Sequence, residues 1–480
     1  MRNFVAAAVA ITAGAFAAPA FAQDSGWQDA PGQVEKALDV QAAPSAREVQ
    51  SSVDAYLASA KADASLVGGC GQAGYDGGFW IRGGTFLMKI NLTLQTRYEM
   101  FTWDDAAARA VPGGDLMGFS LPRVTLKFSG DATCDVHYYA ELEFGHSGST
   151  YDNSRQALSY QTLIFDRNTI PPNAARQANE RPNWGIAREA WIEYEAAPQL
   201  AFRMGLIALP ATRQLMTPAE MQQFVDISMA SAYIGGFDIG YTSRNRDYGF
   251  MIHGALGCDG EWQYMVTVTN GDGPVHRNVL DGTTDDPLAY GARINWDIMG
   301  HMGYEEGALR QHSCEWTASL GAWINYFVDH RSENAIAQFA DRLTWGVDLA
   351  VGWGGFSLTG AYNVLTWKTV ANNALPAADG YSYLIQLGYL FPDTAWEIAA
   401  RYSLYNHDPK GAQVAWEAHE WAAAVNYYID GHADKVTLDV AFISPTKNLG
   451  GNFLADTMAG YNATGTSDGT LIRLQWQLAL

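Results

Sequence analysis

The sequence has little positive charge and, after its first 22 residues, no long apolar run. Lysine and arginine number 30 against 51 acidic residues, giving a net charge of −21. This balance argues against nucleic acid as a partner, because binding it requires a basic face. A membrane helix requires roughly 18 to 20 consecutive apolar residues, and no later stretch approaches that length. Helical membrane proteins are therefore excluded, whereas membrane strands of about 9 to 11 residues are not.

Motifs for catalysis, metals and cofactors are also lacking. The chain contains no G-x-S-x-G, no H-E-x-x-H and no glycine loop of the kind that cradles phosphate. Its 4 cysteines include no C-x-x-C pair, which disfavours a zinc site. We therefore predict that the protein is not an enzyme and holds neither a cofactor nor a metal.

The first 22 residues have the pattern of a secretory signal peptide. Arg2 supplies a short positive region, 4–18 is apolar and small, and Ala20–Ala22 matches an A-x-A cleavage site. We expect the mature chain to begin near Gln23, outside the cytoplasm.

Residues 23–78 differ from the rest because alanine, glutamine, serine and aspartate dominate them. We interpret this segment as a periplasmic N-terminal linker, in which 45–61 forms one short amphipathic helix. A helix for oligomerisation is the alternative interpretation of the same residues. The remainder, 79–480, is expected to form the main domain.

From Phe86 onward, apolar and polar side chains alternate with a period of two. The clearest examples are 88–100, 123–128, 139–144, 290–296, 343–351 and 396–403. The polar series carries Arg, Glu, Asn, Gln, Gly and Ser, and the apolar series ends in Trp or Tyr. A soluble barrel would bury one series in a dry core, whereas a lipid-facing band with aromatic ends around a wet lumen accommodates both. The pattern predicts an all-β, up-and-down antiparallel barrel that spans a membrane.

The connections between these strands alternate between short and long. The short ones fall at 130–136, 195–199, 257–260, 299–314, 353–355, 391–394 and 431–434. The long ones fall at 104–117, 148–186, 207–235, 272–287, 328–341, 368–380, 407–418 and 446–468. Short periplasmic turns with long outer loops are typical of outer-membrane barrels, so about 16 strands are predicted. The connection 299–314 is long for a turn, and 236–256 is either one bulged strand or two short ones.

The stretch 207–235 interrupts the alternation without resembling an ordinary loop. It is partly apolar, rich in methionine, and carries a short helical pattern at 218–229, and we expect an alternating strand to resume near Phe237. Structureless connections of this length are uncommon and usually functional. We therefore predict that it folds into the mouth of the barrel and controls what passes.

The cysteines fall on one side of the predicted meander. Cys134, Cys258 and Cys314 lie in periplasmic turns, and Cys70 precedes the first strand on the same side. An even number of cysteines in an exported chain favours disulfides. Because neighbouring positions around the barrel would pair, we predict the disulfides Cys70–Cys134 and Cys258–Cys314.

The segment 191–240 resembles the phosphate-selective porins of the O and P type. Members carry an aromatic-x-E-Y strand, a strand ending in R-x-G-x-x-x-x-P, a polar segment, then F-V and D-I-G. The matching residues are Trp191, Glu193, Tyr194, Arg203, Gly205, Pro210, Phe224, Val225, Asp238, Ile239 and Gly240. The resemblance implies a homotrimer of outer-membrane barrels, in which 207–235 is the third outer loop and folds inward to narrow the channel.

The expected pore lining follows from the resemblance for the loop and from the alternation for the wall. On the loop, the expected constriction residues are Thr212, Arg213, Thr217 and Glu220. On the wall, the expected lumen-facing residues are Arg97, Arg123, Lys127, Glu141, Glu143, Arg203, Arg293 and Arg401. Cations and acids on the wall balance, which predicts little net selectivity. Family members that select phosphate place Ser, Thr and Lys in the polar segment, where this chain has Met216, Pro218 and Ala219.

We predict an outer-membrane porin of a Gram-negative-type bacterium. Surrounded by outer-membrane lipid, it would pass small hydrophilic solutes or ions through a water-filled channel, and discriminate by pore width and lining charge. A phosphate- or anion-selective porin is the alternative that the resemblance implies. A structural barrel that anchors the envelope and conducts nothing is the third hypothesis.

Overall fold

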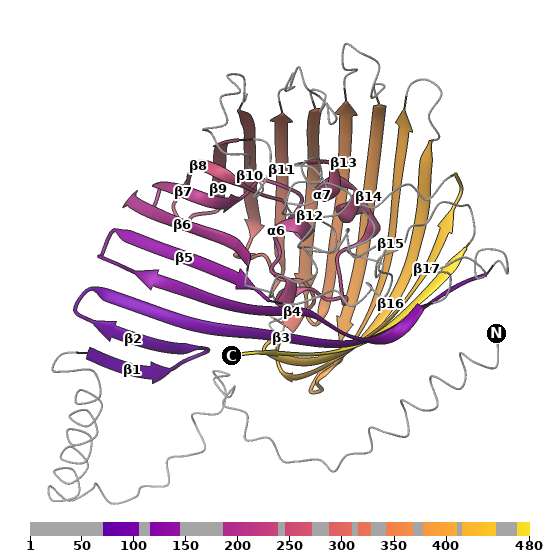
Figure 1. Ribbon diagram of the computed structural model, residues 1–480, viewed down its shortest axis with the longest axis horizontal. Helices are drawn as coiled ribbons and strands as arrows, with labels where there is room; N and C mark the ends of the chain where they lie inside the picture. Colours follow the sequence, from indigo (N-terminus) through magenta and orange to yellow (C-terminus); the bar gives the residue numbers. More distant parts are fainter. Residues whose placement is uncertain are drawn as a thin grey trace, which may run out of the picture. The chain divides into compact units, whose positions relative to one another are not determined.

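The strands of this protein form one closed antiparallel barrel, seen in the computed structural model in Figure 1. The structure describes residues 71–104, 116–144, 186–238, 245–270, 288–309, 315–327, 342–367, 378–409, 415–447 and 468–480. Among these residues, no helix is long and apolar enough to cross a membrane.

The ring of the barrel consists of β3 to β18. Their bounds are β3 Phe86–Trp103, β4 Leu116–Asp131, β5 Val136–Glu143, β6 Ile186–Ala197, β7 Leu200–Ala208, β8 Arg246–Leu256, β9 Trp262–Thr269, β10 Ala289–Met299, β11 Thr317–Phe327, β12 Arg342–Trp353, β13 Phe356–Trp367, β14 Ala378–Leu390, β15 Trp396–Pro409, β16 Trp416–Asp430, β17 Asp434–Pro445 and β18 Gly469–Ala479. Each strand pairs with its neighbours in sequence, and β18 pairs with β3 to close the ring. The predicted barrel of 16 strands is thereby confirmed for the described residues.

The barrel wall is apolar outside and polar inside. In β12, Trp345 and Val347 are 38% and 42% exposed on the outer surface, whereas Asp348, on the opposite face of the same strand, is 3% exposed. In β15, Ile398 is exposed and the adjacent Glu397 is fully buried. A soluble protein would reverse this arrangement, whereas a barrel in lipid with a polar lumen requires it. The faces predicted from the period of two are therefore confirmed in these strands.

Outward-facing aromatic rings gather where the short turns join the strands. Trp262 and Trp296 stack with their ring centroids 5.0 Å apart, and Trp316 and Trp353 stack at 5.2 Å. Indole rings have an apolar body and a polar N–H group, so they favour the boundary between hydrocarbon and water. These pairs mark one edge of the apolar band.

A short hairpin precedes the ring and was not predicted from the alternation. It consists of β1 (Gly71–Tyr75) and β2 (Phe79–Gly83), and β2 pairs with the first residues of β3. The rest of β3 pairs with β18, so the sheet has 18 strands in total. At the junction, Asn91 Nδ2 donates to the carbonyls of Gly77 and Leu480. The glycine-rich sequence of β1 has too few apolar side chains to show a period of two.

The chain after β7 departs from the prediction. The helix α7 occupies Met229–Asp238 and β8 begins only at Arg246, so the predicted strand near Phe237 is wrong. The predicted helical pattern at 218–229 also lies too early in the chain. Ser228 sets the start of α7, because its Oγ accepts a hydrogen bond from the Ser231 N–H at 3.2 Å, as an N-cap does.

Candidate functional site

The connection between β7 and β8 lies inside the barrel (Figure 1). It contains α6 (Arg213–Met216), a 3-10 turn η2 (Ala219–Met221) and α7. Pro210 has no N–H to continue the ladder of β7, so the chain can leave the wall there. The helix α7 packs against strands β12 to β15, so this part of the connection lies against that side of the wall. We call the segment 209–238 the inner loop.

Apolar contacts attach α7 to the wall. Tyr233 is fully buried, stacks on Tyr405 with centroids 5.2 Å apart, and its hydroxyl lies 3.0 Å from His407 Nδ1. Phe224 and Met229 belong to the same buried apolar cluster. The inner loop thus carries a small hydrophobic core within an otherwise polar lumen.

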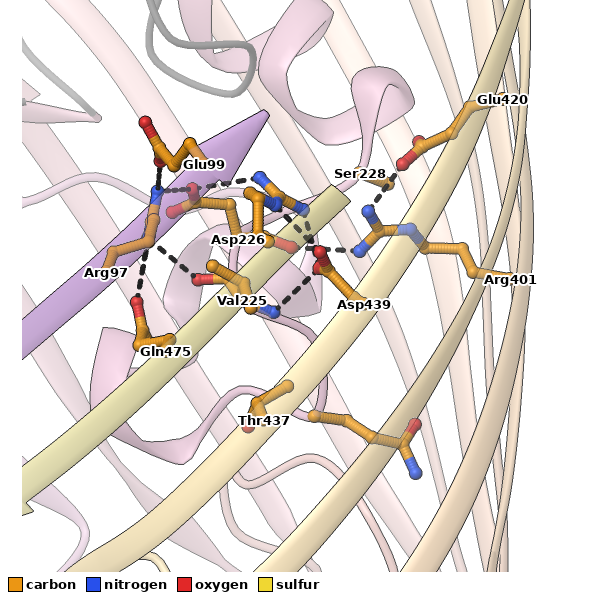
Figure 2. Close-up of polar contacts among 12 residues, drawn as sticks. Arg97, Glu99, Val225, Asp226, Ser228, Arg401, Glu420, Thr437, Asp439 and Gln475 are labelled. Atoms are coloured by element: carbon orange, nitrogen blue, oxygen red, sulfur yellow. Dashed lines mark hydrogen bonds and ion pairs between the residues drawn. The ribbon is translucent and has the colours of Figure 1, made fainter. Parts of the chain in front are cut away.

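Asp226 of the inner loop lies among three arginines of the wall. Its Oδ2 accepts from Arg97 Nη1 at 2.7 Å and from Arg473 Nη1 at 3.2 Å, and its Oδ1 accepts from Arg123 Nη2 at 2.7 Å. Figure 2 shows Arg97 and Asp226 pointing toward each other from β3 and the inner loop. Burial alone would raise the pKa of Asp226, but the charges of Arg97, Arg123 and Arg473 together hold it well below its usual value. We call these four residues the Asp226 cluster.

Further acids neutralise the remaining charge of the Asp226 cluster. Arg473 forms a bidentate pair with Asp439, with distances of 2.8 and 2.6 Å, and Arg97 lies 2.7 Å from Glu99. The backbone N–H of Val225 also donates to Asp439, at 3.2 Å. Three guanidinium groups therefore face three carboxylates, and no net charge is left for a passing ion.

A second ionic anchor holds the start of α7. Arg401 donates to the Asp226 carbonyl at 2.9 Å and to Glu420 at 2.5 Å (Figure 2). The other oxygen of Glu420 accepts from the Met229 N–H at 2.9 Å. A carboxylate at the first amide of a helix is favoured by the helix dipole.

A third anchor joins the wall to the other end of the inner loop. Arg293 forms a bidentate pair with Asp348 at 2.7 and 2.8 Å, and both side chains are fully or almost fully buried. Arg293 also donates to the Ala211 carbonyl at 2.7 Å, and Asp348 accepts from the Arg213 N–H at 3.1 Å. The Arg293–Asp348 pair of the wall therefore binds the backbone of the inner loop.

The four predicted constriction residues lie on the inner loop, but three of them lie within its packing. Thr212, Arg213 and Thr217 are buried, and the Thr217 hydroxyl donates to the Arg213 carbonyl at 3.0 Å. The Arg213 guanidinium donates to the carbonyls of Met302 and Gly303. Burial lowers its pKa, in opposition to the charge of Asp348. Only Glu220, which forms an ion pair with Lys127, keeps a partly exposed side chain.

The wall formed by β5 to β9 has charged side chains that the inner loop leaves partly exposed. Arg203 pairs with Glu193 at 2.7 Å and lies over the Trp191 ring, and His253 contacts the same carboxylate at 2.7 Å. The exposed fraction of the side chain is 20% for Arg203 and 23% for His253. We call this side the open wall. The predicted Glu141 and Glu143 lie on the same wall beside Arg188, but their side chains are only 7% exposed.

The predicted wall residues all face the lumen, although in two different environments. Arg97, Arg123, Lys127, Arg293 and Arg401 contact the inner loop, whereas Glu141, Glu143 and Arg203 belong to the open wall. Sequence reasoning missed Asp226, Arg188 and Arg246. A register shift between β5 and β6 turns Arg188 inward beside Glu189, and parity alone gives no sign of such a bulge.

The predicted disulfides stay predictions. Cys134 and Cys258 are exposed in the turns after β4 and β8, at the same end of the barrel. Cys70 and Cys314 lie outside the described residues.

The sequence matches the family described as phosphate-selective porin O and P over residues 95–478, which is most of the chain. No curated protein matches it. Among solved structures, an anion-selective porin from Comamonas acidovorans shares 12% identity, covers 82% of this chain and 99% of its own, and has a TM-score of 0.49. The outer-membrane channel DcaP of Acinetobacter baumannii shares 12% identity over 82% of this chain and 97% of its own, with a TM-score of 0.48. OmpF of Salmonella typhi, in complex with daunomycin, shares 12% identity over 85% of this chain and 100% of its own, with a TM-score of 0.48.

Proposed function

Since the chain belongs to the phosphate-selective porin O and P family and is an outer-membrane channel, we propose that it is a general porin that does not select phosphate. Small hydrophilic solutes and ions of either sign would cross it by passive diffusion. The inner loop narrows the lumen, and pore width and the lining charges decide which solutes pass.

The observation that carries this proposal is the neutralisation of the Asp226 cluster. An anion filter needs guanidinium groups that are free to replace the hydration shell of a passing anion. In this chain Asp226 already accepts from Arg97, Arg123 and Arg473. A phosphate ion would have to displace a carboxylate that is covalently part of the inner loop.

The route for solutes follows the open wall. Where the inner loop packs on the wall, the side chains of Arg293 and Asp348 are 0% and 1% exposed. On the open wall, Arg203 and Glu193 form a partly exposed pair. Because both signs of charge line this route, the channel would have only weak ion selectivity.

The test is the reversal potential of single channels in a potassium chloride gradient, for the unchanged protein and for Asp226→Asn. We expect a reversal potential near zero for the unchanged protein and a shift toward anions for the variant, because the cluster then has one excess positive charge. Asp259→Asn, which removes the same charge from an exposed turn, should not shift the potential. The double variant R123Q/D226N restores neutrality and should return to the unchanged value.

Strong anion selectivity of the unchanged protein, with its current blocked by added phosphate, would contradict the proposal and favour the phosphate-selective alternative. No current at all would favour a structural barrel. We also propose, from the family, that the protein is a homotrimer without enzymatic activity, and light scattering of the detergent-solubilised protein would give the number of chains.

A further inference from the structure

The connection between β10 and β11 also enters the lumen, from the end opposite to the inner loop. The chain reverses direction at every strand, so the turn after β10 lies at the same end as the turns after β4 and β8, whereas the inner loop follows β7. Within this turn, Glu306 is 3% exposed and Ala308 is fully buried. An ordinary turn at a barrel rim would be solvated, so 300–309 is a folded-in segment. We call it the inner turn.

Glu306 joins the inner turn to the inner loop. Its backbone N–H donates to the Met221 carbonyl at 2.9 Å. Its carboxylate accepts from Gln214 Nε2 at 2.9 Å and from the Gln223 N–H at 2.9 Å. Two points of the loop, before and after η2, are thus held by one side chain.

The inner turn is also attached to the wall. Gln386 Nε2 of β14 donates to Glu306 at 3.0 Å, and the Ala308 N–H donates to Glu397 of β15 at 3.1 Å. The Tyr304 hydroxyl accepts from Arg293 Nε at 3.0 Å. Gly307 has a φ of +84° and lies so close to Glu397 that a Cβ would stand 3.1 Å from its carboxylate. These contacts and the glycine at position 307 favour an inward path for this turn.

We propose that the channel is constricted from both ends, by the inner loop from one side and the inner turn from the other. Glu306 positions the two against each other, beside the Arg213 guanidinium, which donates to the carbonyls of Met302 and Gly303. The inference rests on the proposed channel function for its effect on current, and on the hydrogen bonds alone for its effect on structure.

Loss of the Glu306 carboxylate would remove the acceptor that Gln214 Nε2, the Gln223 N–H and Gln386 Nε2 share, and of these donors Gln386 Nε2 would keep Gln223 Oε1 as an acceptor at 3.0 Å. Buried donors without an acceptor are costly, so this part of the inner loop should separate from the turn. The Asp226 cluster lies farther along the loop and uses none of these contacts. The pore should then widen while its ion selectivity stays the same.

The experiment compares Glu306→Ala and Glu306→Gln with the unchanged protein in planar bilayers. Because conduction depends on pore width, we expect a conductance increase of roughly twofold for Glu306→Ala and a smaller one for Glu306→Gln, which keeps one oxygen acceptor. The reversal potential should not move. Glu261→Ala, the same change in the turn between β8 and β9, should leave the conductance as it is. A folded barrel is verified by resistance to trypsin and to cold detergent.

Hydrogen exchange provides a second measurement that does not depend on current. In the unchanged protein the N–H groups of Gln223, Glu306 and Ala308 are hydrogen-bonded and buried, so peptides that contain them should exchange slowly. In Glu306→Ala they should exchange at least about tenfold faster, and in Glu261→Ala they should not. Unchanged conductance together with unchanged exchange in a folded Glu306→Ala protein would overturn the inference. Faster exchange in a protein that conducts nothing would support the joint between loop and turn and contradict only the channel function.

Discussion

The two sides of the lumen use the same residue types for different purposes. On the side packed by the inner loop, Arg293 and Asp348 form an ion pair whose side chains are 0% and 1% exposed, and they also bind the loop backbone. On the open wall, Arg203 and Glu193 form a pair of similar length, but the side chains are 20% and 10% exposed. An arginine–carboxylate pair is thus buried against the loop on one side and partly exposed on the other.

This difference shows that a list of lumen-facing charges does not give the selectivity of a channel. A buried pair has its charges fully engaged, and its rupture leaves an isolated ion in a medium of low polarity. A partly exposed pair is screened by water and contributes little to stability, but it retains a field that a passing ion feels. Burial therefore decides which charges bear on transport.

The largest effect on conductance should come from removing the inner loop. The loop's two ends are already joined, because the Leu209 N–H donates to the Asn245 carbonyl at 2.9 Å and Asn245 Nδ2 donates back at 2.7 Å. Replacing 211–243 by a short Gly-Ser linker should therefore preserve the barrel. We expect a several-fold rise in single-channel conductance and a shift toward anions, since the deleted segment holds one arginine and three acids.

Removal of 448–467 between β17 and β18 is the matched control for the loop replacement. It shortens a long connection and leaves every residue of the inner loop in the chain, so conductance should change little. An equal rise in both variants would show that the inner loop does not set the width of the channel.

A smaller effect, on the free energy of unfolding, should distinguish the buried ion pair from the partly exposed one. Asp348→Asn leaves Arg293 buried beside a neutral partner, and should lower the free energy of unfolding by about 3 to 5 kcal/mol. Glu193→Gln changes the partly exposed pair, and should cost about 1 kcal/mol or less. Urea titration in lipid vesicles, followed by tryptophan fluorescence, measures both. Glu193→Gln should also shift the reversal potential toward anions, whereas an equal loss of stability in the two variants would remove the distinction between the walls.

The wall could be predicted from the sequence because a strand has a fixed period. Once Trp345 and Val347 are assigned to lipid, Asp348 must face the lumen, and the same parity places Arg97, Arg293 and Arg401 inside. The alternation of short and long connections then gives the strand number. No contact between distant residues is required for either step.

The inner loop could not be predicted in the same way. Asp226 follows Phe224 and Val225 in a segment without a period, so parity does not assign its direction. Its partners Arg97 and Arg473 belong to β3 and β18, which become neighbours only when the barrel closes. The inner turn left a weak signal, because 299–314 was too long for its place in the meander.

The smallest expected effect concerns pH, and it follows from the position of Asp226 on the packed side. The three arginines depress the pKa of Asp226 in the folded protein. The stabilisation of the folded state by this carboxylate is therefore fully present above the ordinary aspartate pKa of about 3.9, and is lost as the pH falls through the depressed pKa. The contribution of Asp226 to the conductance and to the reversal potential should thus be the same at pH 7 and at pH 5. The unchanged protein should approach Asp226→Asn, whose side chain at this position does not titrate, only at a pH well below the ordinary aspartate pKa of about 3.9, because the folded-state pKa of Asp226 is depressed. A change between pH 7 and pH 5 that is absent from Asp226→Asn would mean that Asp226 is not held by its arginines, and that this part of the loop is as accessible as the open wall.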